Sequence, residues 1–136
     1  MTLGKAQWSA LIPHQGAMCL LDEIVGWTAT TIHARSDSHP RGDHPLRSGG
    51  LLRAVHLCEY GAQAMAVHGA LLAGAGSAPA RPGMLVSLRA VEFAVTRIDD
   101  LAGTLDIHAE RLAAGERSCQ CAFRIEHRGD LLALGR

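Results

Sequence analysis

Two spacings of apolar residues alternate along the chain. Between residues 51 and 73, apolar and small residues recur at the three- and four-residue spacing of a helix, about 23 residues and roughly 35 Å long. Shorter runs rich in β-branched and apolar residues flank it and predict strands. These runs are residues 18–36 (two strands with a turn or bulge at Gly26), 84–95, 103–113, 116–127 and 131–136.

Segments dense in turn-forming residues separate these elements. Residues 37–50 form a loop before the helix and residues 74–83 form one after it. Ser48 is a candidate N-cap for a helix that begins at about Leu51. The Arg-Gly-Asp triplet at 128–130 is typical of a hairpin turn, which we prefer to an integrin-binding motif.

The composition of the helix indicates how the elements pack. Many of its positions are glycine or alanine, which keeps the helix thin and lets strands approach closely. One long helix among many antiparallel strands is buried when the sheet wraps around it. With 136 residues, 48% of them hydrophobic, the chain predicts a single α+β domain over residues 1–136.

Charge and cysteine usage exclude several classes of protein. The formal net charge is zero, which argues against nucleic acid as a partner. No apolar run is long enough to cross a membrane, and the N-terminal residues lack the apolar segment of a signal peptide, so we expect a cytoplasmic protein without a membrane partner. The cysteines and histidines do not show the spacing of zinc ligands, so we expect no metal site. We interpret the four cysteines, Cys19, Cys58, Cys119 and Cys121, as small reduced residues. Cys119 and Cys121 lie two apart in a predicted strand and therefore point to the same face.

Three stretches, in order along the chain, carry a resemblance to a known family. They are "IPHQGAMCLLDEIVGW" at 12–27, "DHPLRSGG" at 43–50 followed by "EYGAQAMAVHG" at 59–69, and "PGMLVSLRAVEF" at 82–93. The chain resembles the hotdog-fold 3-hydroxyacyl-[acyl-carrier-protein] dehydratases, and within them the dehydratase-like branch of aryl-polyene clusters. The middle stretch is the most specific, although the Phe-Pro-Gly of the fatty-acid dehydratases is absent from it.

The resemblance implies a hotdog fold, in which an antiparallel sheet wraps a long central helix. It implies dehydration of 3-hydroxyacyl carrier-protein thioesters to trans-2-enoyl thioesters in fatty-acid-like or polyene lipid biosynthesis. The substrate would be carried on phosphopantetheine, with no other cofactor. Expected partners are acyl carrier protein and a second subunit, in a homodimer, a higher homo-oligomer or a heterodimer. Candidates for carrier-protein docking, or for a merely solvated surface, are Arg35, Arg41, Arg47 and Arg81.

Glu59 is the residue that most needs a chemical explanation, because it is a lone carboxylate on a helix built for burial. A carboxylic acid removed from water stays protonated and suits general acid catalysis of hydroxyl departure. A histidine suits the base, and by resemblance the histidine of one subunit would face Glu59 of the other. His44 is our first choice, with His39, a substrate-binding candidate, as the alternative. Glu59 facing solvent, or paired with an arginine, is the structural alternative.

Three further residues are candidates for the substrate site. Backbone N–H groups at the expected helix start, near Gly50 and Leu51, would stabilise charge on the thioester oxygen. Gln63 lies one turn after Glu59 and would orient the acid or the substrate, or else satisfy a buried backbone group.

Two other functions fit the same fold. An acyl thioesterase would use the helix carboxylate to activate water or attack the thioester, and requires no loop histidine. A non-catalytic hotdog subunit would bind an acyl chain or carrier protein, or complete a heterodimer.

Overall fold

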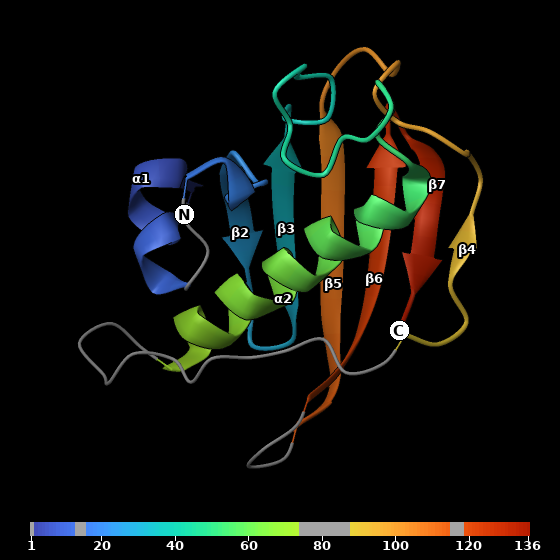
Figure 1. Ribbon diagram of the computed structural model, residues 1–136. Coiled ribbons are helices and arrows are strands. Elements are labelled where there is room, and N and C mark those ends of the chain that lie inside the picture. Colours follow the sequence, from blue (N-terminus) through green and yellow to red (C-terminus); the bar gives the residue numbers. More distant parts are fainter. Residues whose placement is uncertain (1, 13–15, 74–87, 115–118) are drawn as a thin grey trace.

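One antiparallel sheet and one long helix make up the fold in the computed structural model, which describes residues 2–12, 16–73, 88–114 and 119–136 (Figure 1). Helix α2, Leu57–Ala73, lies diagonally across one face of the sheet. Seven described strands pair in the order β1-β2-β3-β5-β6-β7-β4. Their bounds are β1 Leu3–Gly4, β2 Glu23–Trp27, β3 Thr31–Ser36, β4 Glu92–Phe93, β5 Leu105–Ala114, β6 Cys119–His127 and β7 Asp130–Gly135.

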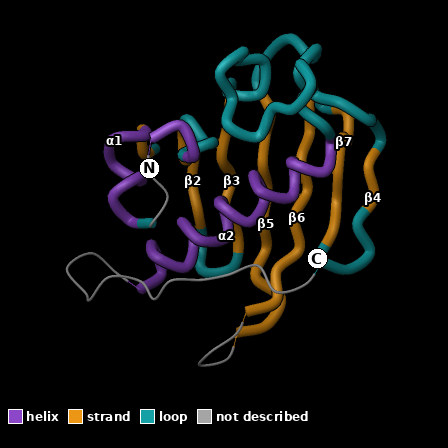
Figure 2. The backbone as a smooth tube through the Cα atoms, in the orientation of Figure 1, coloured by secondary structure: helices purple, strands orange, loops and turns teal. Residues whose placement is uncertain are grey.

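Short helical turns complete the described elements. Helix α1, Lys5–Trp8, continues into the 3₁₀ turn η1, Ser9–Leu11, and two more 3₁₀ turns are η2, Gly16–Met18, and η3, Ala54–His56. Loops gather at one end of the sheet, beside the start of α2 (Figure 2). In the part of the chain that the structure describes, no helix is long and apolar enough to cross a membrane.

Most predicted strands are confirmed, with bounds that differ by a few residues where the structure describes them. Gly26 lies at a register shift between β2 and β3, so the bulge is confirmed there. Arg128 and Gly129, with φ of 52° and 84°, form the predicted hairpin turn between β6 and β7. Of the run expected over 84–95, residues 84–87 lie outside the described residues and β4 covers only two positions.

The predicted start of the long helix at Leu51, with Ser48 as its N-cap, is wrong. Ser48 and Leu51 exchange two backbone hydrogen bonds of 2.8 and 3.0 Å around Gly49 and Gly50, whose φ values are 58° and 77°. Such positive φ values make a tight hairpin turn that glycine adopts easily. The residues that follow form hydrogen bonds with another segment instead of within a helix, since the Ala54 N–H donates to the carbonyl of Thr96. Helix α2 begins only at Leu57.

The predicted close approach of strands to a thin helix is confirmed at Gly61. A Cβ atom there would lie 2.9 Å from Cγ of Phe123 on β6. A Cβ atom at Gly135 on β7 would lie 2.9 Å from Cε1 of the same ring. The buried Phe123 ring therefore fills the space between α2 and β7 only because both neighbours lack a side chain.

Candidate active site

Glu59 stands in the first turn of α2 and is exposed in the single chain. It belongs to a stripe of small or apolar residues at alternating four- and three-residue spacing, which we call the outer stripe: Val55, Glu59, Ala62, Ala66, Gly69 and Ala73. Val55 is 53% exposed and Ala62 is half-buried, so the chain's own sheet does not cover this face. Burial of Glu59 by a partner stays a prediction.

Neither arginine that sequence reasoning offered as a partner neutralises Glu59. Within the described residues, Arg53 and Arg89 form no ion pair with it. Arg53 instead donates to the carbonyl of Ser48 over 3.4 Å. The helix therefore presents a carboxylate, without a countercharge among these residues, on an otherwise apolar strip.

His44 is buried, and both of its ring nitrogens have partners within the chain. Its Nδ1 accepts a hydrogen bond of 3.1 Å from the Leu46 N–H, and its Nε2 lies 2.9 Å from the Tyr60 hydroxyl. Because a backbone N–H only donates, neutral His44 carries its proton on Nε2 and donates to Tyr60. Burial, followed by the charge of His56 and of two nearby arginines, lowers the pKa of His44, which keeps the ring neutral.

The Tyr60 hydroxyl begins a series of hydrogen bonds in which each hydroxyl donates to the next oxygen. It donates to Ser38 Oγ over 2.7 Å, Ser38 donates to Ser36 Oγ over 2.9 Å, and Ser36 donates to the Leu20 carbonyl over 2.5 Å. Burial raises the pKa of Tyr60 to about 12, so the hydroxyl keeps its proton. These hydrogen bonds hold the His44 ring against buried Tyr60 and leave neither ring nitrogen free for a substrate.

His39, the alternative histidine, lies entirely inside the molecule. Its Nε2 is 2.7 Å from the Leu101 carbonyl, to which it donates, and its buried Nδ1 has no partner among the described residues. Burial lowers its pKa. The ring therefore ties the loop before α2 to the segment before β5, and the single chain does not bring His39 to Glu59.

Gln63 is buried, and both the oxygen and the nitrogen of its amide group bond to backbone groups. Its Oε1 accepts from the N–H groups of Leu20 and Leu21 at 2.7 and 3.2 Å, and its Nε2 donates to the Met18 carbonyl at 2.8 Å. Of the two roles weighed for Gln63, the structure shows the support of a buried backbone segment.

Gly50 and Leu51 lie before the start of α2. Their N–H groups, which we expected to donate hydrogen bonds to the thioester oxygen, are therefore not at a helix N-terminus. The Leu51 N–H is already bonded to Ser48, and the Gly50 carbonyl accepts from Arg47. Of the arginines considered as docking candidates, Arg35 pairs with Asp106 and Arg41 pairs with Asp43. Arg81 lies outside the described residues.

A hollow of about 240 Å³ opens between α2 and β6. Ala62 of the outer stripe lines it, together with Cys58 and Met65 of α2 and the neighbouring Leu88 and Arg89. Cys119 and Cys121 form part of its wall on the sheet side. The hollow therefore reaches the same helix face that presents Glu59.

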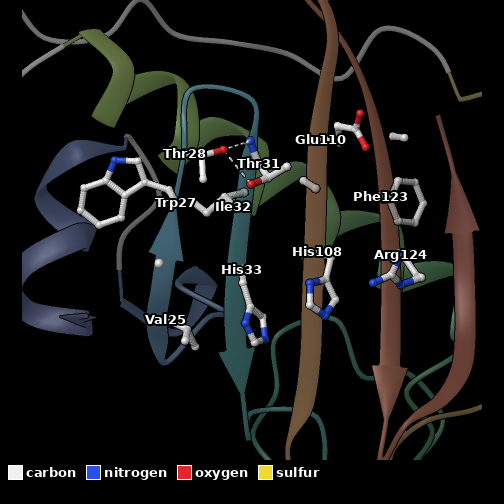
Figure 3. A pocket seen from close by; sticks show the side chains of 13 residues that line it. Val25, Trp27, Thr28, Thr31, Ile32, His33, His108, Glu110, Phe123 and Arg124 are labelled. Carbon is white, nitrogen blue, oxygen red and sulfur yellow. Dashed lines mark hydrogen bonds between the residues drawn. The ribbon is translucent and has the colours of Figure 1, made fainter. Parts of the chain in front are cut away.

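A second hollow, of about 460 Å³, lies on the opposite face of the sheet. His33, His108 and Arg124 stand side by side there on β3, β5 and β6, with α2 behind the strands (Figure 3). Each has a carboxylate partner: His33 lies 2.7 Å from Asp106, while His108 and Arg124 lie 3.4 and 3.2 Å from Glu126. Because His33, His108 and Arg124 already have carboxylate partners, we take the first hollow and the outer stripe as the stronger candidate site.

Comparison with known proteins identifies the family. The ApeP-like family, described as ApeP dehydratase, matches residues 6–136. The chain belongs to this dehydratase family. Among solved structures it is similar to "The Dehydratase Heterocomplex ApeI:P from Xenorhabdus doucetiae", with a TM-score of 0.82 and 25% identity, over 94% of this chain and 86% of that one. No curated protein matches.

These comparisons confirm the hotdog fold and the aryl-polyene-cluster branch that the sequence stretches indicated. Sequence reasoning missed Tyr60, Ser38 and Ser36 as one hydrogen-bonded unit. A signal was present, because Tyr60 is the single tyrosine of the chain and interrupts a run of small residues. A buried tyrosine hydroxyl needs a polar partner, and the loop before the helix was the nearest source of one.

Proposed function

We propose that this protein is one subunit of a dehydratase that converts 3-hydroxyacyl thioesters on acyl carrier protein to trans-2-enoyl thioesters, with Glu59 as the general acid. The observation that carries the proposal is Glu59, exposed on the outer stripe beside the hollow that Ala62 lines. Family membership supports dehydration, and the thioester on phosphopantetheine is our choice of substrate.

The reaction needs two proton transfers. A base takes a proton from the carbon beside the thioester, and an acid protonates the departing hydroxyl, so that water leaves as the double bond forms. A carboxyl group covered by a partner is removed from water, which favours the protonated form that an acid catalyst needs. The hollow would receive the acyl chain next to Glu59.

The base is proposed to come from a second hotdog subunit that packs on the outer stripe. Within one chain His44 is buried against Tyr60 and has both nitrogens bonded, so neither nitrogen is available to act with Glu59. The similar structure from Xenorhabdus doucetiae is itself a heterocomplex of dehydratase subunits, which supports an assembly of this kind.

The test supplies 3-hydroxyacyl carrier protein and measures the enoyl product, with the reverse hydration as a second readout. Glu59→Gln keeps the shape but loses the acid proton, so we expect turnover to fall by about 10²–10⁴. The matched control is Glu110→Gln, which changes an exposed carboxylate on β5 and should leave turnover unchanged. Equal activity of Glu59→Gln and wild type would refute the assignment.

The same assay separates the alternatives. Release of free acid without enoyl product would favour the thioesterase, and retention of acylated carrier protein without either product would favour the binding subunit. His44→Gln tests the origin of the base, because glutamine retains one donor and one acceptor. Retained turnover supports a base from a different polypeptide, whereas loss of turnover in a folded His44→Gln protein assigns that role to His44 of a second copy or of the same chain.

The proposed interface has its own test. Ala66→Glu puts a second carboxylate on the outer stripe and should dissociate the assembly, measured by light scattering at fixed protein concentration. Ala102→Glu, at an exposed position outside the helix, is the control. An unchanged molar mass for Ala66→Glu would place the partner elsewhere.

A further inference from the structure

Two thiols are in contact at the wall of the hollow between α2 and β6. Cys119 and Cys121 occupy alternate positions of β6, so their side chains point to the same face. Their Sγ atoms lie 3.2 Å apart, and neither is in a disulfide. A disulfide has an S–S bond of about 2.05 Å, so bond formation needs an approach of only about 1.2 Å.

The backbone permits this bond but strains it. Residues two apart in a strand have Cα atoms about 6.6 Å apart, at the upper end of the range that disulfides span. The paired strand β5 has a register shift between Arg111 and Ala113, opposite Gln120 and Cys121, so the ladder is already irregular here. Strained and exposed disulfides are readily reduced, which is the property of regulatory rather than structural bonds.

We propose that Cys119 and Cys121 are a redox modification site, which forms a readily reversible disulfide when it meets a low-molecular-weight disulfide such as oxidised glutathione. The Cys119 thiolate attacks one sulfur of the oxidant, breaks its S–S bond and releases one thiol. Cys121 then attacks Cys119 Sγ in the mixed disulfide, loses its proton and releases the second thiol. Two protein thiols are oxidised and one oxidant molecule is reduced to two thiols.

The surroundings of the two residues favour this order of attack. Cys119 is exposed and meets the oxidant first, whereas Cys121 is half-buried. Burial, together with its hydrogen bond to Cys119, raises the pKa of Cys121 to about 12, which disfavours Cys121 as the first attacking thiol. Cys58 lines the same hollow from α2 but is buried, which makes it an internal control.

The experiment incubates the reduced protein with oxidised glutathione, alkylates the remaining thiols and measures intact mass and linked peptides. We expect the loss of two hydrogens and a Cys119–Cys121 link in the wild type, and the same result in Cys58→Ser. Cys121→Ser should stop at a glutathione adduct on Cys119. These readouts do not measure dehydration, so a negative result would count against the disulfide and not against the proposed function.

Two outcomes would overturn the inference. One is a stable glutathione adduct on Cys119 in the wild type, without the internal bond, because the strand would then hold the sulfurs apart. The other is a Cys119–Cys121 bond that survives an excess of reduced glutathione, because a strained bond must be reduced readily.

Discussion

Replacing either of two glycines of α2 by alanine adds one methyl group, and the two replacements should change the free energy of unfolding in opposite directions. Alanine is favoured over glycine in a helix interior by about 1 kcal/mol, so propensity alone predicts that both Gly61→Ala and Gly69→Ala are stabilising. The surroundings differ. At Gly61 the new Cβ would lie 2.9 Å from Cγ of Phe123, close to the root of a buried ring, whereas at Gly69 the nearest atom is Nη2 of Arg111 at 3.6 Å.

The magnitudes decide the sign at each site. Overpacking a well-filled core costs about 1–3 kcal/mol, and the Phe123 ring has no free direction because Gly135 closes its other side. We therefore expect Gly61→Ala to lower the free energy of unfolding by about 0–2 kcal/mol. Gly69→Ala meets only ordinary van der Waals contact and should raise it by up to about 1 kcal/mol.

Urea denaturation measures both changes, and repeating it at two protein concentrations separates any effect on association, because Gly69 lies on the outer stripe. The double variant Gly61→Ala/Phe123→Leu removes the ring edge, so its loss should be smaller than the sum of the two single losses. If Gly61→Ala is as stable as Gly69→Ala, the close contact of α2 with Phe123 does not constrain the core, and the reasoning fails.

Three further predictions follow from buried polar groups. Gln63→Leu leaves two N–H groups and one carbonyl unpaired, and should lower the free energy of unfolding by about 2–5 kcal/mol in urea titrations. Tyr60→Phe removes a hydroxyl that both accepts and donates, and should cost about 1–3 kcal/mol; no loss would contradict the hydrogen-bonded chain. Burial lowers the pKa of His39, His44 and His108 from 6.5, so the unfolded chain binds more protons, and stability should be complete above that pH and fall below it. The fall is up to about 1.4 kcal/mol per pH unit for each histidine, and stability that rises between about pH 7 and about pH 5 would contradict it.

The succession of strands and helix along the chain, and the thinness of the helix, could be predicted from sequence because they depend on local pattern. Composition that favours strands predicted β5, β6 and β7, and the glycines and alanines of the stretch 59–69 predicted a helix approached closely by a sheet. The start of α2 was not accessible. Leu52 and Ala54 have the same apolar character as the helix, but their N–H groups bond to Asp99 and to the carbonyl of Thr96, across about 40 residues of sequence.

The candidate site shows why spacing alone does not assign a role. Glu59 and Gln63 lie about 40° apart on a helical wheel, so spacing placed them on one face. The structure separates them, because residues 18–21 cover the flank that holds Gln63 and leave Glu59 uncovered. Tyr60 lies about 100° from Glu59 on the wheel, and its buried hydroxyl is the hydrogen-bond partner of His44. Within the described residues, exposed Glu59 and the His44 ring bonded to buried Tyr60 do not form one site, which is why we propose that the base comes from a second subunit.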